Sequence, residues 1–575
     1  PRLAGFSLKC FCWLLEMRMT NALILAYMRK ANLITEIFQK TQYSEPPMYS
    51  PQYLEKQVEE KMVEVLPTGS TAPQRVAVAV RCLPPYVPKP SINGGNHDHI
   101  DAQKFQYATV RDYAHAYSSG RFTPTQVAER FLAAVEETQK MSPALNLFIP
   151  LDAQNVLSQA AASTERYREG GQLSVLDGIL IAVKDEIDCL PYPTTGGCTW
   201  LDKTRQVTED AAVVKRLREC GAIMVGNTNM HELGAGTTGI NPHYGTTRNP
   251  HDRTRISGGS SGGSAATVAA GLCPIALGVD GGGSVRMPAS LCGIVGLKPT
   301  FGRITKSGLL PLNWTIGMLG TLTGSVEDAY IIYAAKQGHL PSDKLLSFPP
   351  PATLPLLNDS QTESTNMAKL IGDVKFAKFP KWFNDTDDPV GRICDKALQL
   401  VQGTYGCKVV DVSIPELQAM RLAHYITIGS ECSAALGVQY ENVGQKVSGG
   451  DVRSTITIFQ CFNNREYVTA PRIRSRCMQH HMDIFEKADF IVTPTTACTA
   501  SPVREVAEKY GELDYQNGGL PAISIPVGYD DKGLPIGLQL IGRPWSEATL
   551  LRMAIAFEKI CAPQLQPEVY FDLLK

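Results

Sequence analysis

The chain lacks features that would place it in several common classes of protein. Its most apolar segment, residues 6–34, is interrupted by charged residues and falls short of the roughly 18 uninterrupted apolar residues that a transmembrane helix needs. The net charge is −1, and no long basic run occurs, so no positive field is available to attract nucleic acid. The sequence therefore predicts neither a membrane-spanning helix in that segment nor a nucleic-acid partner.

Cysteine and histidine are present, but without the spacing of metal sites. The 15 cysteines form no CxxC pair, and the closely spaced histidines are two isolated pairs, at 97/99 and 480/481. An odd number of scattered cysteines, with no evident cleavable secretory signal, predicts reduced thiols in a cytosol-facing protein. We therefore expect no metal and no other cofactor.

Glycine and serine, by contrast, are concentrated in residues 256–300. This segment contains GGSSGGS at 258–264 and DGGGSVR at 280–286, separated by an apolar, helix-like stretch. Glycine at such density marks backbone that takes φ > 0 or approaches a ligand closely. Three consecutive glycines, Gly281, Gly282 and Gly283, can turn successive N–H groups toward one point, as an oxyanion hole requires.

Three other interpretations of this segment compete. On composition alone it is equally typical of a flexible turn. A phosphate-binding loop is disfavoured, because GxxxxGK[ST] is absent. Residues 258–262 also fit the G-x-S-x-G nucleophile elbow, but that elbow follows a buried strand, and residues 249–255 are polar.

A lysine upstream supplies a base for these serines. Residues 177–185, DGILIAVKD, indicate a short buried strand that ends at Lys184. A lysine in that position loses hydration, which favours the neutral amine. A neutral amine can take a proton from a serine hydroxyl without a histidine. Lys184, Ser260 and Ser284 together indicate a Ser–Ser–Lys relay.

With these elements, the chain from about Val110 to Ile541 resembles the amidase signature family. The resemblance implies that Ser284 is the nucleophile, that Ser260 is a bridging serine on a cis peptide, and that Lys184 is the base. The family's supporting positions match Gly281, Gly282, Gly283 and Ser284 for the oxyanion-hole N–H groups, and Ser261, Asp280 and Arg286 around the serine loop.

Finer motifs resemble the plant-type fatty acid amide hydrolases of this family. They include DEIDCLP at 185–191, MHELG at 230–234, GTTRNPHD at 245–252 and KWFND at 381–385. The resemblance implies hydrolysis of N-acylethanolamines to a free fatty acid and ethanolamine by a membrane-associated homodimer with a hydrophobic acyl channel. We accordingly expect the protein on the cytosolic side of the endoplasmic reticulum or plasma membrane.

The same resemblance suggests where the substrate binds. Gly234 and Ala235 match positions beside the scissile amide. The apolar side chains near the expected acyl chain are either channel lining or ordinary core, with even weight: Ile456, Ile458, Phe459 and Phe462.

Helical and strand-like patterns alternate from Val110 onward. Helices are predicted from residue 123 and around 153–168 and 210–220, and strands at 178–183, 222–226, 274–279, 490–495, 521–528 and 534–542. This alternation predicts an α/β fold with a mixed or parallel sheet covered by helices on both faces. The family resemblance implies about eleven mixed strands. We expect one catalytic domain over residues 106–575.

Residues 1–105 are predicted to be an appendage to that domain. Residues 6–34 predict an amphipathic helix, which either packs on the core or a second subunit or lies in a bilayer interface, a position that suits Trp13 and the flanking basic residues. Residues 41–100 are rich in proline and predict a linker.

Two alternative functions remain at this stage. The A-type subunit of a glutaminyl-tRNA amidotransferase shares the serine motifs, but it would need partner subunits and no apolar N-terminal helix. An inactive scaffold on the amidase fold is the second alternative. It is favoured by the segment between Tyr510 and Pro521, which is shorter than in relatives, and disfavoured by the intact Lys184, Ser260 and Ser284.

Overall fold

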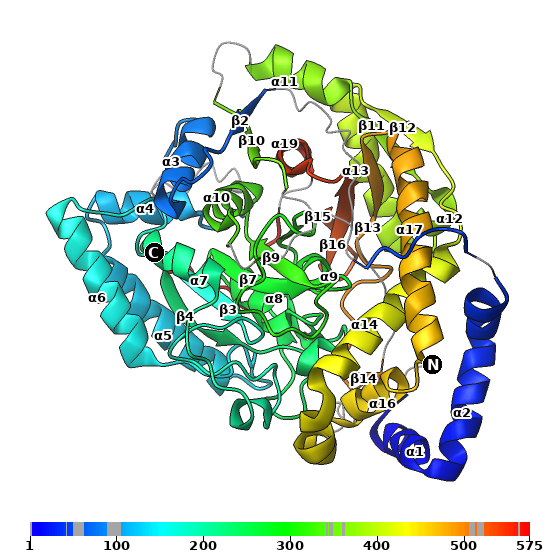
Figure 1. Ribbon diagram of the computed structural model, residues 1–575. Coiled ribbons are helices and arrows are strands. Elements are labelled where there is room, and N and C mark those ends of the chain that lie inside the picture. The colour runs from blue at the N-terminus through cyan, green and yellow to red at the C-terminus, as the bar shows by residue number, and fades with distance from the viewer. Residues whose placement is uncertain are drawn as a thin grey trace.

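A computed structural model describes residues 3–41, 43–49, 62–88, 105–340, 343, 349–358, 363–504, 512–513, 522–561 and 564–575 (Figure 1). At its centre is a ten-stranded sheet with the strand order β12-β11-β13-β16-β15-β8-β9-β7-β3-β4. The strands are β3 (Leu180–Lys184), β4 (Ile223–Thr228), β7 (Ile275–Asp280), β8 (Val295–Lys298), β9 (Met318–Thr323), β11 (Lys375–Lys378), β12 (Lys408–Asp411), β13 (Phe490–Pro494), β15 (Ala522–Tyr529) and β16 (Pro535–Gly542).

The sheet is mixed, as predicted. β3 pairs in parallel with β4 and β7, and β11 pairs in parallel with β12 and β13. The strands between these two parallel groups pair antiparallel. Most of the strands are buried along their whole length, which explains why they are continuous apolar runs rather than alternating ones.

Helices flank this sheet and shield it from solvent (Figure 1). α8 packs on β3, β7 and β9, while α10 packs on β8 and β9 and α13 packs on β13, β15 and β16. Helices of the catalytic domain include α5 (Pro124–Lys140), α6 (Ala153–Glu169), α7 (Ala212–Glu219), α8 (Gly262–Ala269), α10 (Val326–Lys336), α13 (Asp388–Tyr405), α14 (Leu417–Gln439), α16 (Gly450–Phe459), α17 (Asn464–Phe485) and α19 (Glu547–Ile560).

The number of strands in the central sheet is close to the expected value of about eleven. Among the described residues, this sheet has ten strands. The remaining strands among the described residues form three two-stranded sheets: β1 (Leu3–Ala4) with β14 (Glu512–Leu513), β2 (Val63–Val65) with β10 (Thr353–Pro355), and β5 (Arg248–Asn249) with β6 (Asp252–Ile256). Because each of these short strands pairs with another peripheral strand, none extends the central sheet.

The N-terminal segment forms two helices where the sequence predicted one. α1 (Gly5–Glu16) and α2 (Arg18–Ala31) are separated at Met17, whose backbone is extended. The side chains of Thr20 and Asn21 donate to the carbonyls of Leu14 and Leu15, which are among the last carbonyls of α1. These side-chain bonds satisfy carbonyls that a continuous helix would have bonded internally, so they stabilise the break.

Part of the predicted proline-rich linker is an ordered helix. α3 (Ala72–Cys82) begins with a capping box between Thr71 and Gln74 and has a proline in its first turn. It packs on α10, and Arg75 donates to the carbonyls of Ala334 and Ala335. The shortened segment near residues 510–521 lies outside the described residues except for residues 512–513.

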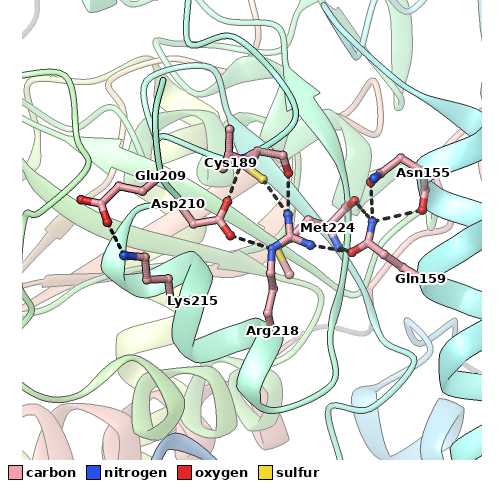
Figure 2. Close-up of polar contacts among 9 residues, drawn as sticks. Asn155, Gln159, Cys189, Glu209, Asp210, Lys215, Arg218 and Met224 are labelled. Carbon is pink, nitrogen blue, oxygen red and sulfur yellow. Dashed lines mark hydrogen bonds and ion pairs between the residues drawn. The ribbon is translucent and has the colours of Figure 1, made fainter. Parts of the chain in front are cut away.

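A polar network holds the chain just beyond β3 (Figure 2). Arg218 of α7 donates to the Leu190 carbonyl at 2.6 Å, to Asp210 at 2.9 Å and to Gln159 of α6 at 2.8 Å. Gln159 in turn exchanges two hydrogen bonds with the backbone of Met224 in β4. The turn that follows Lys184 is therefore tied to two helices and a neighbouring strand.

Candidate active site

The last residue of β3, Lys184, is completely buried, and its amino group has three partners. Nζ lies 2.7 Å from Ser260 Oγ, 3.3 Å from the Val279 carbonyl and 2.8 Å from Glu186 Oε2. The strand thus carries the lysine directly to one of the predicted relay serines, although the two residues are far apart in the sequence.

Ser260 lies in the tight loop that leads into α8. The Gly259–Ser260 peptide is cis, and the Ser260 carbonyl accepts a hydrogen bond from the His231 N–H at 3.1 Å. The next residue, Ser261, donates its N–H to the Ser284 carbonyl at 3.1 Å. This bond joins the two glycine-rich segments, so that Ser260 and Ser284 are carried by adjacent loops.

The loop that carries Ser284 is held by a buried ion pair. Arg286 donates twice to the carboxylate of Asp280, at 2.8 and 3.0 Å, and a third time to Gln539 at 2.6 Å. Asp280 also accepts the N–H groups of Gly283, at 2.9 Å, and Val285, at 3.2 Å. The contacts fit the supporting role predicted for Asp280 and Arg286. They also engage the Gly283 N–H, which leaves those of Gly281, Gly282 and Ser284 as the candidate oxyanion donors.

The residues at the two ends of the predicted relay differ in their exposure to solvent. Lys184 and Ser260 are 0% and 1% exposed, whereas Ser284 and Gly282 are partly exposed within an otherwise buried loop. This gradient suits a nucleophile that must meet a substrate and a base that must stay dry.

Gly234, which precedes Ala235, lies beside the relay. A Cβ atom at Gly234 would lie 3.6 Å from Ser260 Oγ and 3.8 Å from Glu186 Oε2, and Gly234 has φ +65°. A side chain at this position would therefore be strained and would occupy the space beside the bridging serine.

Ala235 packs against an apolar cluster of buried side chains. It contains buried side chains from several elements, and Ala235, Tyr425 and Phe462 pack against it: Cys198, Trp200, Leu201, Leu233, Leu310, Leu312, Cys432, Leu436, Tyr440, Val452, Ile456 and Phe459. Tyr425 and Phe462 also line a cavity of about 150 Å³ between α2, α14 and the end of α16. Of the four residues proposed as channel lining or core, Ile458 and Phe462 line this cavity, whereas Ile456 and Phe459 belong to the buried cluster.

Burial shapes the electrostatics around the site. Desolvation raises the pKa of Asp185 to about 6, although Thr195, Gly197 and Asn227 donate hydrogen bonds to its carboxylate. Burial alone would also raise the pKa of Asp280, but the charges of Arg286 and Lys298 and the Gly283 N–H hold that pKa below its usual range. Asp280 is therefore an anion that fixes the loop.

The sequence did not single out several residues at the site. Glu186 contacts Lys184, and a Cβ atom added at Gly281 or Gly282 would lie nearest to Asn313 or His424, respectively. Burial lowers the pKa of His424 to about 4, so its imidazole is neutral at pH 7. Residue 186 lies in the turn after β3, so strand alternation gave no signal for its contact with Lys184. His424 comes from α14, far away in the sequence, and had no signal either.

Among the residues that the structure describes, no group of three or more histidine, cysteine, aspartate or glutamate side chains is arranged to hold a metal ion. In the same part of the chain, no helix is both long and apolar enough to cross a bilayer.

Comparison with known proteins assigns the family. The model of the Amidase family matches residues 128–551. This chain belongs to the amidase family. Its curated relatives include the fatty acid amide hydrolases of Arabidopsis thaliana and Oryza sativa subsp. indica, 44% and 43% identical to it, with alignments that cover all of this chain and 95% of each relative.

More distant relatives of this amidase share less of the chain. A glutamyl-tRNA(Gln) amidotransferase subunit of Chloroflexus aggregans is 33% identical over 80% of this chain and 97% of its own length. Among solved structures, an amidase with a TM-score of 0.67 is 25% identical and covers 79% of this chain and 100% of its own. The peptide amidase of Stenotrophomonas maltophilia has a TM-score of 0.62 at 25% identity and covers 80% of this chain and 98% of its own. These neighbours agree with the predicted amidase fold.

Proposed function

We propose that this amidase hydrolyses fatty acid amides, with N-acylethanolamines as the substrate class. The observation that carries the proposal is the similarity along the whole chain to proteins named fatty acid amide hydrolase. The products are a free fatty acid and ethanolamine. The amidotransferase relatives are less similar and match a smaller part of the chain.

The proposed mechanism uses the two loops and the buried lysine. Ser284 attacks the amide carbonyl while its proton passes to Ser260 and the Ser260 proton passes to Lys184. Backbone N–H groups of the 281–284 loop stabilise the oxyanion. The proton returns through Ser260 to the leaving ethanolamine, and water then cleaves the acyl ester by the same route. The contact of 2.7 Å between Lys184 and Ser260 supports this path.

The apolar cluster beside Ala235 is the proposed site of the acyl chain. It starts next to Gly234, close to the bridging serine, and reaches the cavity beneath α2 through Tyr425 and Phe462. A long alkyl chain gains about 0.8 kcal/mol for each buried CH₂ group, which favours lipid amides over small polar ones.

The α1–α2 hairpin is the proposed membrane contact. It exposes Phe6, Trp13, Met19, Leu23 and Tyr27, each by 60% or more, while Leu8, Cys12 and Leu15 on the other face of α1 are buried. A peripheral position of this kind places the cavity beneath α2 close to a lipid surface. We also propose that the protein is a homodimer that faces the cytosol at the endoplasmic reticulum or plasma membrane.

The experiment that tests the substrate is a hydrolysis assay with the purified full chain. We expect release of fatty acid and ethanolamine from a long-chain N-acylethanolamine in detergent micelles without partner proteins, and no release by the Ser284→Ala variant. Release of ammonia from glutamine only with added partner subunits would support an amidotransferase instead. A folded wild-type protein that hydrolyses no amide would support the scaffold alternative.

A further inference from the structure

A buried carboxylate lies at the relay and has no part in the Ser–Ser–Lys mechanism. Glu186 follows the end of β3, is 3% exposed and places Oε2 2.8 Å from Lys184 Nζ. Its backbone is fixed on both sides: the Glu186 N–H donates to the Lys184 carbonyl at 2.7 Å, and its carbonyl accepts from Leu310 N–H at 3.0 Å. The side chain is therefore held where it meets the lysine.

The three neighbours of Lys184 Nζ can pair with every N–H group or lone pair that Nζ carries in either protonation state. An ammonium group has three N–H donors, and Nζ has three acceptors in reach: Ser260 Oγ, the Val279 carbonyl and Glu186 Oε2. A neutral amine has two N–H donors and one lone pair. If its two N–H groups bond Val279 and Glu186, the lone pair points at the Ser260 hydroxyl, as a base requires.

We propose that Glu186 is a positioning residue for the amide hydrolysis, which orients Lys184 and stabilises its protonated form. It acts on the lysine as the aspartate of a Ser-His-Asp triad acts on its histidine. This inference deepens the proposed function and rests on it for the substrate, but not for the reactivity of Ser284.

The proton transfers that accompany the attack of Ser284 are balanced among Ser284, Ser260 and Lys184. As Ser284 Oγ bonds to the carbonyl carbon, its proton moves to Ser260 Oγ, and the Ser260 proton moves to Lys184 Nζ. Lys184 becomes an ammonium ion that donates to Ser260, Val279 and Glu186. Glu186 gains and loses no proton. When the leaving amine takes the proton back through Ser260, Lys184 returns to the amine, and its N–H bond to Glu186 is kept.

Three substitutions of Glu186 separate charge from orientation. Glu186→Gln keeps an oxygen that accepts from Lys184 but removes the charge, Glu186→Asp keeps the charge on a shorter side chain, and Glu186→Ala removes both. We expect kcat to fall about 10-fold for the Gln variant and about 100-fold or more for the Ala variant, with the Asp variant retaining more activity than Ala and KM within about twofold. The matched control is Glu558→Gln, which changes a carboxylate that accepts from the Val326 N–H, remote from the relay.

A double-mutant cycle provides the decisive comparison. The rate constant for labelling of Ser284 by an alkyl fluorophosphonate is measured for wild type, Glu186→Gln, Lys184→Ala and the double variant, each checked for folding by thermal melting. We expect Glu186→Gln to slow labelling in wild type and to have no further effect in Lys184→Ala. The inference would be overturned if Glu186→Gln slowed labelling equally in wild type and in Lys184→Ala. It would also be overturned if Glu186→Gln and Glu186→Ala kept the wild-type kcat. Because labelling needs no amide substrate, wild type that is labelled but cleaves no fatty acid amide would disprove only the proposed substrate.

Discussion

The buried relay and the α1–α2 hairpin are opposite kinds of structure within one chain. Lys184 contacts three groups and is completely buried. The hairpin is joined to the remainder through α1, which packs beside α16 (Figure 1), and through ion pairs such as Arg453 with Glu16 and Arg29 with Glu466. Its outer face exposes aromatic and aliphatic side chains.

The relay and the hairpin should respond differently to substitution. In the relay, Lys184 and Ser260 are hydrogen-bonded to each other within a buried polar network, so the loss of one atom disturbs the position of several others. In the hairpin, the exposed side chains contribute little to the stability of the folded chain. We therefore expect relay substitutions to change kcat strongly and hairpin substitutions to change only what the protein binds.

The largest effect should come from Lys184→Ala. The substitution removes the base that accepts the Ser260 proton and the acid that returns it to the leaving amine. We expect kcat to fall by about 1,000-fold or more while the protein still folds, measured by hydrolysis of N-acylethanolamine and thermal melting. Near-normal turnover at neutral pH would show that the relay assignment is wrong.

A smaller loss of activity is expected from Arg286→Lys. Lysine keeps the charge beside Asp280 but cannot make the two-pronged contact or reach Gln539 as well, so the loop that carries Ser284 should be less well fixed. We expect kcat to fall by about 10-fold to 100-fold with a lesser change in KM. A loss of thermal stability with unchanged kcat would mean that the ion pair serves folding alone.

In the hairpin, Trp13→Ser combined with Leu23→Ser should leave the chemistry intact. Both side chains are exposed, by 60% and 72%, so hydrolysis of a short soluble amide should stay within about twofold of wild type. Binding to phospholipid vesicles should fall by about tenfold or more, because each buried side chain of this size contributes about 1.5–3 kcal/mol. Sedimentation of the protein with vesicles measures this.

Val87→Ser is the control for that experiment, since Val87 is 79% exposed outside the hairpin. If the double variant keeps its vesicle binding but sediments as a monomer where wild type is a dimer, the hairpin face contacts a second copy instead of a bilayer.

The smallest effect concerns stability and pH. Lys336 is fully buried on α10, donates to Thr321, and has a pKa lowered to about 7 by burial. Because the unfolded chain binds this proton up to a pH near 10.5, unfolding takes up a proton between these values, and stability rises with pH from about 7 to 10. Lys336→Met should reduce that slope, measured by denaturant unfolding at pH 7, 8 and 9. An unchanged slope would contradict the lowered pKa.

Much of the fold was predictable because its strands are continuous apolar runs. Strands β3, β4, β7, β13, β15 and β16 lie where these runs predicted them, and α5, α6 and α7 follow their capping and periodicity signals. The break at Met17 was not predicted, because it depends on side-chain bonds from Thr20 and Asn21 that leave no mark on the apolar pattern. The helix within the proline-rich linker was missed because one of those prolines lies in its first turn, where proline is favourable.

The site was predictable to a similar extent. The motifs identified Lys184 and the two glycine-rich loops, and the structure brings Lys184 against Ser260. The contacts between particular pairs of groups could not be predicted from the motifs. The engagement of the Gly283 N–H by Asp280, and the contact of Glu186 with Lys184, depend on where side chains turn after a strand ends.

The most direct test of the relay is covalent labelling with a long-chain alkyl fluorophosphonate, followed by mass mapping, on wild type and Ser284→Ala in parallel. We expect one adduct on Ser284 of wild type, loss of the adduct in the variant, and slower labelling when N-acylethanolamine competes. An adduct on another serine, or none on folded wild type, would contradict the Ser–Ser–Lys relay.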